Sequence, residues 1–304
     1  MKLTDIVDEE YKTIDSHTIK KNSVEDNPII FEKLRKEYES FLLHAQKARI
    51  DELEREEHVQ RFLPQLFAKY PWTSKDITEL SLVLKDYEHH EEFKYSGYFL
   101  SYLINHSHLL NPKEKYLIVT KHLETKINAL CYKNKSSVTI DGDSGNYLCW
   151  QMICGTVIVN GNAEEYACEK MKNGTVTITG NTTYGAGYHL KGGKLIIKGN
   201  ANFDVGLRAE GGKILVNGNV GDECGYDFRN GMIHVKGNCG KDLGKRMRSG
   251  TIRVDGSTKK SVGNFMEGGT IYLLQDEKEI QLGTPFGNKG KIYSRKKQIF
   301  PKER

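Results

Sequence analysis

Between Ser136 and Leu274 the sequence repeats itself every nineteen residues. The repeat is clearest in its glycines, and one row follows the nineteen-residue step at Gly155, Gly174, Gly193, Gly212, Gly231, Gly250 and Gly269. A second row has the same step at Gly142, Gly161, Gly180, Gly199, Gly218, Gly237 and Gly256. A fixed period of about 20 residues without heptads is typical of a solenoid whose coils stack on one another. The spacing predicts about seven such coils.

Each repeat also contains a short segment whose first and third residues are apolar: Val138/Ile140, Val157/Val159, Val176/Ile178, Leu195/Ile197, Ile214/Val216, Ile233/Val235, Ile252/Val254 and Ile271/Leu273. Alternation of period two places such pairs on one face of a strand, here the inner face of a parallel β-helix. The second glycine row follows these strands, and we expect its members to make the turn with positive φ. Another apolar column predicts a second inward-facing strand in each coil: Met152, Met171, Leu190, Ala209, Phe228, Met247 and Met266.

The residue after each turn glycine is polar and forms a column of amides. The column comprises Asn162, Asn181, Asn200, Asn219 and Asn238, with Asp143 before it and Ser257 after it. In a parallel stack these side chains lie about 4.8 Å apart. We therefore expect an asparagine ladder in which the amides hydrogen-bond to one another along the solenoid axis.

Two of the six cysteines, Cys149 and Cys168, occupy the register of a third glycine row. The chain has no C-x-x-C pair, and no histidine repeats in register with the cysteines to complete a zinc site. We interpret the cysteines as small buried residues, the usual state of a free thiol. A redox or metal-binding pair is the alternative. We expect no metal and no cofactor.

The remaining segments differ from the repeat. Residues 1–26 form a polar arm, residues 27–130 a helical domain, residues 131–274 the right-handed β-helix, and residues 275–304 a cap with a basic tail. Helix starts are indicated at Asn27-Pro28, at Thr73-Ser74 and at Asn111-Pro112, and the last of these helices should run to Leu130. Gly290 to Tyr293 resembles one more coil displaced by two residues.

Surface positions of the solenoid suggest two candidate sites. Ile158, Ile196 and Leu215 fall where a strand should face solvent, and such an apolar stripe requires a cover, either the N-terminal helices or a partner protein. Stacked carboxylates at Asp204, Glu223 and Asp242 would suit a carbohydrate-active lyase or hydrolase, but we favour a solvated turn face as their explanation. Neither pattern forms a complete catalytic constellation.

Charge divides the chain into two halves. Residues 1–130 carry 19 Lys/Arg against 23 Asp/Glu, and residues 131–304 carry 26 against 17, so that the halves have net charges of −4 and +9. Docking of one half on the other explains this asymmetry better than nucleic-acid binding does, because no aromatic platform accompanies the basic residues. The chain contains no apolar run long enough to cross a membrane. We expect a cytoplasmic protein, and a homo-oligomer is compatible with the pattern.

One complete repeat runs from Gly218-Asn219-Val220-Gly221 through Gly225, Phe228 and Gly231 to Gly237. It resembles the GXGXG repeat family, which includes the C-terminal domain of the glutamate synthase large subunit and one of the subunits of formylmethanofuran dehydrogenase. The resemblance covers residues 136–274 and implies a right-handed β-helix. In those enzymes this domain is a structural element, so the resemblance supplies no catalytic residue. It implies a stand-alone scaffold or accessory subunit that assembles with an oxidoreductase or another enzyme.

Overall fold

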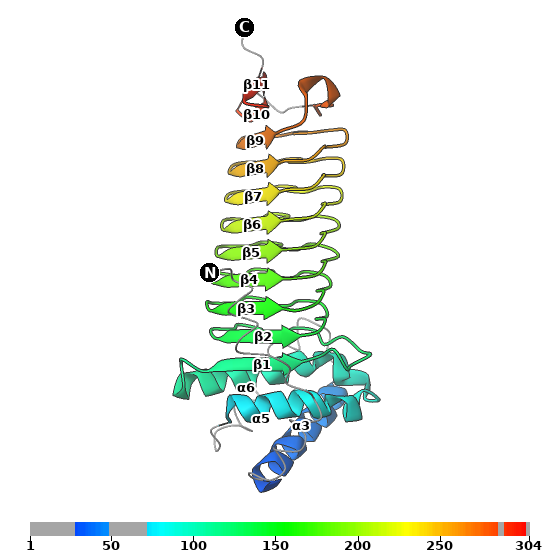
Figure 1. Cartoon of the computed structure of the whole chain (residues 1–304), viewed down its shortest axis with the longest axis vertical. Helices are drawn as coiled ribbons and strands as arrows, with labels where there is room; N and C mark the ends of the chain where they lie inside the picture. Colours follow the sequence, from blue (N-terminus) through cyan, green and yellow to red (C-terminus); the bar gives the residue numbers. More distant parts are fainter. Residues whose placement is uncertain (1–27, 49–71, 285–288, 302–304) are drawn as a thin grey trace, which may run out of the picture.

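The structure is a computed structural model that describes residues 28–48, 72–284 and 289–301. The polar arm expected at residues 1–26 lies outside these ranges. Within them, three helices and a long solenoid follow one another in the sequence and in space (Figure 1). The helices form the base, and the coils rise from it one above another. This arrangement confirms the predicted fold class of N-terminal helices followed by a parallel β-solenoid.

One sheet runs the whole length of the solenoid, with its strands in sequence order. They are β1 (Lys115–Val119), β2 (Ser137–Asp141), β3 (Thr156–Val159), β4 (Thr175–Ile178), β5 (Lys194–Ile197), β6 (Lys213–Val216), β7 (Met232–Val235), β8 (Thr251–Val254), β9 (Thr270–Leu273), β10 (Lys291–Ser294) and β11 (Lys297–Phe300). Pairing is parallel from β1 to β10, which gives about nine turns. The predicted number, about seven, is smaller because it omitted the coils at the two ends.

The inner columns account for the stability of the stack. Both apolar members of every repeat strand are buried, as their alternation predicted. The second apolar column, from Met152 to Met266, is buried as well, but its residues directly follow the turns and do not form the predicted second strand. Around Leu190, for example, Gly187 and His189 have φ values of 75° and 49°. Residues in the left-handed region interrupt extended backbone, so the described coils share one continuous sheet and elsewhere meet in isolated parallel bridges such as the one between Ala163 and Thr182.

The glycines after the strands have a different role from the one expected. Gly142 has a φ of 128°, whereas Gly161 and the five that follow it in the row are not in the positive-φ region. These six are glycines because the coils approach closely. A Cβ atom on Gly199 would lie 2.5 Å from both Asn181 Oδ1 and Gly180 O of the preceding coil. The expectation of positive φ is therefore wrong for them, and close packing takes its place.

Three helices close the lower end of the solenoid: α3 (Pro28–Ala48), α5 (Ser74–Val83) and α6 (Ser96–Leu110). Two short 3-10 helices, η1 (Leu84–Tyr87) and η2 (Glu91–Tyr95), connect α5 to α6. Thr73 caps α5 by accepting a hydrogen bond from the Asp76 N–H, while the Asp76 carboxylate accepts one from the Thr73 N–H, as the predicted start requires. The α5 helix packs on β1 (Figure 1), and one hydrophobic core continues from the helices into the coils.

The predicted helix from Asn111-Pro112 to Leu130 is wrong, because this segment contains β1 and the first coil. Tyr116 and Ile118 of β1 are buried, and Lys115 pairs with Ser137, which lies 22 residues later. This step departs from the nineteen-residue period, so the first coil is not recognisable from its spacing. The division of the chain into separate domains at residue 130 remains a prediction.

The upper end closes with a strand pair. Strand β10 is parallel to β9, and Lys291 pairs with Thr270, which confirms a final coil displaced by two residues. The chain then reverses, and β11 pairs with β10 in the antiparallel sense. Reversal of direction ends the parallel stacking and provides the cap that a solenoid requires at its open end.

Candidate functional site

The asparagine column forms a continuous ladder, but through different atoms from those expected. The Oδ1 atom of each asparagine from Asn162 to Asn219 accepts a hydrogen bond from the backbone N–H of the next asparagine at 2.8 Å. Asp143 begins the ladder by accepting from the Asn162 N–H at 2.7 Å, and the Ser257 N–H ends it on Asn238 at 2.8 Å. The ladder thus satisfies the backbone of each turn, which makes it a structural feature and not a binding site.

The carboxylate candidates come together on the edge formed by the turns of the coils, here called the turn edge. Asp204, Glu223 and Asp242 have left-handed backbones with φ values of 59°, 59° and 58°. Lys245 Nζ lies 2.9 Å from Glu223 Oε1 and 3.6 Å from Asp242 Oδ2. These two carboxylates are therefore held by one lysine within the chain.

Asp204 differs from the other two because it is only 7% exposed. Burial raises the pKa of its carboxyl group, the neighbouring Glu223 raises it further, and a hydrogen bond from Tyr184 opposes the change. Its Oδ1 atom is buried and has no hydrogen-bond partner among the described residues. An oxygen without solvent contact cannot reach a substrate, so this geometry gives little support to a carbohydrate-cleaving site.

Aromatic rings line the lower part of the turn edge, a feature missed in the sequence. Tyr147 and Tyr166 stack at 5.3 Å with an interplanar angle of 9°, and Tyr184 meets Tyr166 edge-on at 5.3 Å. Tyr147 also lies 5.8 Å from Trp150. The nineteen-residue separation of Tyr147 and Tyr166 was a signal that could have revealed the stack. Because the rings cover one another, the stack joins coils and does not offer open ring faces to nucleotide bases.

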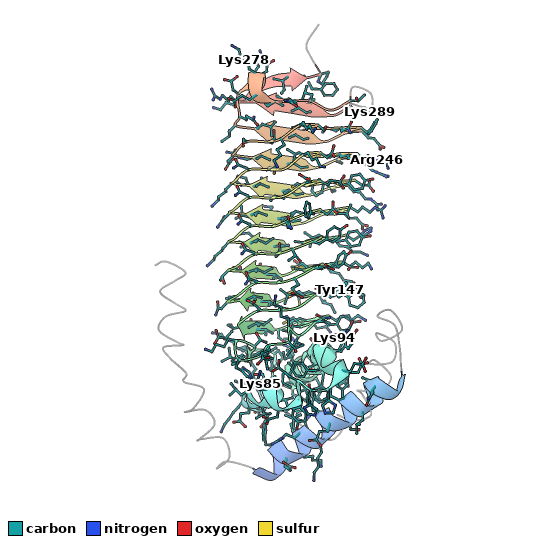
Figure 2. All side chains as sticks on the ribbon, turned by 90° about the vertical axis from the view of Figure 1, so that its right-hand side faces the viewer. Lys85, Lys94, Tyr147, Arg246, Lys278 and Lys289 are labelled. Carbon is teal, nitrogen blue, oxygen red and sulfur yellow. The ribbon has the colours of Figure 1, made fainter. Side chains whose placement is uncertain are left out.

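Ion pairs continue along the same turn edge. Asp227 is buried and lies 3.4 Å from Arg208, 3.4 Å from Arg229 and 2.6 Å from Arg248. Tyr147 and Arg246 extend toward one side of the solenoid at different heights, which shows how the aromatic and charged parts share this edge (Figure 2). Carboxylates and cations of adjacent coils therefore pair with one another within the protein.

The outer face of the sheet is different. Ile158, Ile196 and Leu215 lie on the outward side of β3, β5 and β6, where each is half-buried, and Ile196 pairs in register with Leu215. The described helices lie at the base, beneath β1, and not over this stripe (Figure 1). Four exposed lysines flank the apolar residues: Lys194, Lys198, Lys213 and Lys236. None of these lysines has an ion-pair partner within the described ranges.

All six cysteines are free thiols, and five of them are buried. The Cys149 thiol is within hydrogen-bonding reach of both Cys131 and Cys168 in the adjacent coils. Burial raises the pKa of Cys149 well above its usual value, which disfavours the thiolate that metals bind. Across the described part of the chain, no group of three His, Cys, Asp or Glu side chains is arranged to hold a metal ion.

Comparison with known families agrees with this geometry. The family model described as the GXGXG motif matches residues 115–286, more than half of the chain. The chain belongs to the GXGXG motif family. The match begins at the first residue of β1, so the GXGXG region includes the coil that lies outside the nineteen-residue spacing. No curated protein matches the chain. No helix within the described residues is long and apolar enough to span a membrane.

Proposed function

We propose that this GXGXG protein is a non-catalytic scaffold or accessory subunit that assembles with an oxidoreductase or another enzyme complex. The observation that carries the proposal is the outer sheet face, where an apolar stripe and unpaired lysines lie together on regular secondary structure. A partly exposed apolar stripe with charged residues around it has the anatomy of a protein interface, an apolar centre with a polar rim.

The rest of the solenoid supports a structural role. Side chains fill the interior of every coil, and the polar groups at the turns are occupied by the asparagine ladder and by ion pairs. A stack of this kind holds its surface in a fixed arrangement, since each coil is bonded to the next along the whole sheet. Rigid presentation of a binding face is what a scaffold requires.

The test is affinity purification of the tagged full chain from its own cells after mild cross-linking, followed by size-exclusion chromatography and quantitative mass spectrometry. We expect enzyme subunits to be recovered in a fixed stoichiometric ratio to the tagged chain. Recovery of the tagged chain alone, at low salt and with cross-linking, would contradict the scaffold function. Deletion of the helices is an unsuitable control, because their core is continuous with that of the first coils.

A further inference from the structure

We propose that the outer face of β5 and β6 binds an acidic segment of a partner protein in extended conformation, with carboxylates and aliphatic residues at alternate positions. The inference rests on the proposed scaffold function and specifies the chemistry of the partner.

Two lysines of this face repel each other. Lys194 and Lys213 are direct partners in the register of β5 and β6. Neighbouring parallel strands are about 4.8 Å apart, and like charges at opposed positions destabilise a sheet. At the turns of neighbouring coils, by contrast, Asp227 offsets the repulsion between stacked arginines. An unpaired lysine column is stabilised when an acidic partner supplies the missing charge.

The centre of this face is apolar. Ile196 and Leu215 lie between the lysine at the start of each strand and the residue that follows its end, which is Lys198 for β5. A polyanion such as nucleic acid would neutralise the lysines but leave these aliphatic side chains uncovered. A protein segment can do both, because it carries carboxylates and aliphatic groups together.

The distance between outward-facing side chains along β5 suits an extended partner. Lys194 and Ile196 occupy alternate positions along β5, about 6.6 Å apart, and Lys198 follows directly after the end of the strand. An extended partner presents its own alternate residues at this same distance. A segment in which an acidic residue, an aliphatic residue and a second acidic residue alternate with any others would place each side chain against its complement. Both sides of β5 and β6 are already paired in the sheet, so this contact is made by side chains and not by strand addition.

The experiment measures fluorescence anisotropy of labelled probes with the purified full chain. One probe is a synthetic peptide that repeats the Asp-Thr-Val-Thr-Asp pattern, and the others are polyglutamate and a single-stranded oligonucleotide of equal charge. We expect the peptide to bind most tightly, and the variant Lys194→Glu/Lys213→Glu to weaken it about tenfold or more. Leu215→Thr should weaken the peptide several-fold and leave polyglutamate binding unchanged.

The matched control is Lys259→Glu/Lys260→Glu, which makes the same change of charge at two exposed lysines beyond β8. This control should bind the peptide like the unchanged protein. Equal affinity for all three probes, with no effect of Leu215→Thr, would make the face a general polyanion site and overturn the proposal. Absence of peptide binding would overturn it too, as would self-association of the full chain that Lys194→Glu/Lys213→Glu abolishes.

The two proposals can fail separately. When the purification from cells is repeated with Lys194→Glu/Lys213→Glu, loss of the co-purifying subunits supports this face as their docking surface. Undiminished recovery of those subunits would leave the scaffold function standing and overturn the docking surface. Peptide binding without any subunit recovered from cells would instead retain the surface chemistry and contradict the scaffold function.

Discussion

The turn edge of the solenoid and its outer sheet face at β5 and β6 are built from the same coils but differ in how their charges are paired. On the turn edge, Asp227 lies among Arg208, Arg229 and Arg248, and Lys245 is held between Glu223 and Asp242. On the sheet face, Lys194 lies in register with Lys213, and neither has an anionic partner in the described residues. Several charges of the turn edge are therefore paired within the chain, and Asp255 pairs with His234 and Arg253 on the sheet face at β7 and β8, whereas the lysines at β5 and β6 have no such partner in the described residues.

The difference has a simple physical meaning. In a solenoid any charged column repeats at the spacing of the coils, so its repulsion accumulates unless it is interrupted. The turn edge interrupts its cations with buried or half-buried carboxylates. The sheet face has no such interruption at β5 and β6. The paired charges of the turn edge are accounted for by the stability of the fold. The unpaired lysines at β5 and β6 are better accounted for by the docking surface proposed above.

The most severe test of this comparison removes the central charge of the turn edge. Asp227→Asn retains a side chain that tolerates the left-handed backbone at φ 48° but leaves the surrounding arginines without their counter-charge. We expect a loss of about 2 kcal/mol in the free energy of unfolding, measured by urea denaturation, because breaking a buried ion pair is costly. Glu267→Gln changes an exposed partner of Arg248 and serves as the control, with an expected loss below about 0.5 kcal/mol. Equal losses in the two variants would contradict the special role of Asp227.

A second test concerns the protonation of Asp204. Its raised pKa means that the folded state binds a proton more tightly than the unfolded state, so its contribution to stability is present at acid pH and decreases as pH rises above the usual aspartate range. Asp204→Asn cannot ionise and should be more stable than the unchanged protein at pH 7, on the order of 1 kcal/mol. Denaturation curves at several pH values measure this gain, which should shrink toward pH 4. A gain that is independent of pH would contradict the assignment.

The smallest expected effect lies on the sheet face. Lys213→Thr introduces the residue type that β3, β4, β8 and β9 carry at the equivalent position, and it relieves the repulsion with Lys194. We expect the free energy of unfolding to rise by about 0.2–0.5 kcal/mol at low salt. The gain should disappear at high salt, where exposed charges are screened. Destabilisation by this substitution would show that Lys213 has a structural role and would weaken the contrast between the two faces.

Much of the fold could be predicted because the coils are so nearly identical. Strict recurrence identified the inner strand pairs and the asparagine column, and the displaced beginning of the last coil was visible at Gly290 to Tyr293. The first coil was missed because β1 lies outside the period and follows Asn111-Pro112, a pair that also suits the start of a helix. The helix-start signal at Asn111-Pro112 therefore led to a wrong prediction, because β1 does not follow the nineteen-residue period that identifies the other coils.

Details within the coils depended on atomic contacts that spacing does not reveal. A Cβ atom on Gly206 would lie 2.6 Å from Ile233 Cδ1, and three other glycines of its row, Gly187, Gly225 and Gly244, meet an isoleucine 27 residues later in the same way. At the same separation from Cys149 and Cys168 stand Val176 and Leu195 in place of isoleucine. The cysteines thus follow a change in the opposing side chain, a pairing that becomes visible only when neighbouring coils are superposed in space.

Among the candidate sites, the sequence revealed the members of each column but not their environment. The burial of Asp204 and the mutual stacking of Tyr147 with Tyr166 depend on how adjacent turns pack. The apolar stripe was visible, yet its surrounding lysines gained meaning only when their lack of partners within the described ranges was known. The sequence shows which residues stack in a column along the solenoid. The structure is needed to show whether their side chains are buried, stacked or ion-paired within the protein.

The unbroken pairing from β1 to β10 has a consequence for dimensions. Nine steps of about 4.8 Å separate the helical base from the last parallel strand by roughly 43 Å. Each coil is bonded to the next by the same backbone contacts, so this length cannot change gradually; it changes only when a whole repeat is gained or lost. The number of repeats therefore sets the distance between the two ends of the solenoid in steps of one coil.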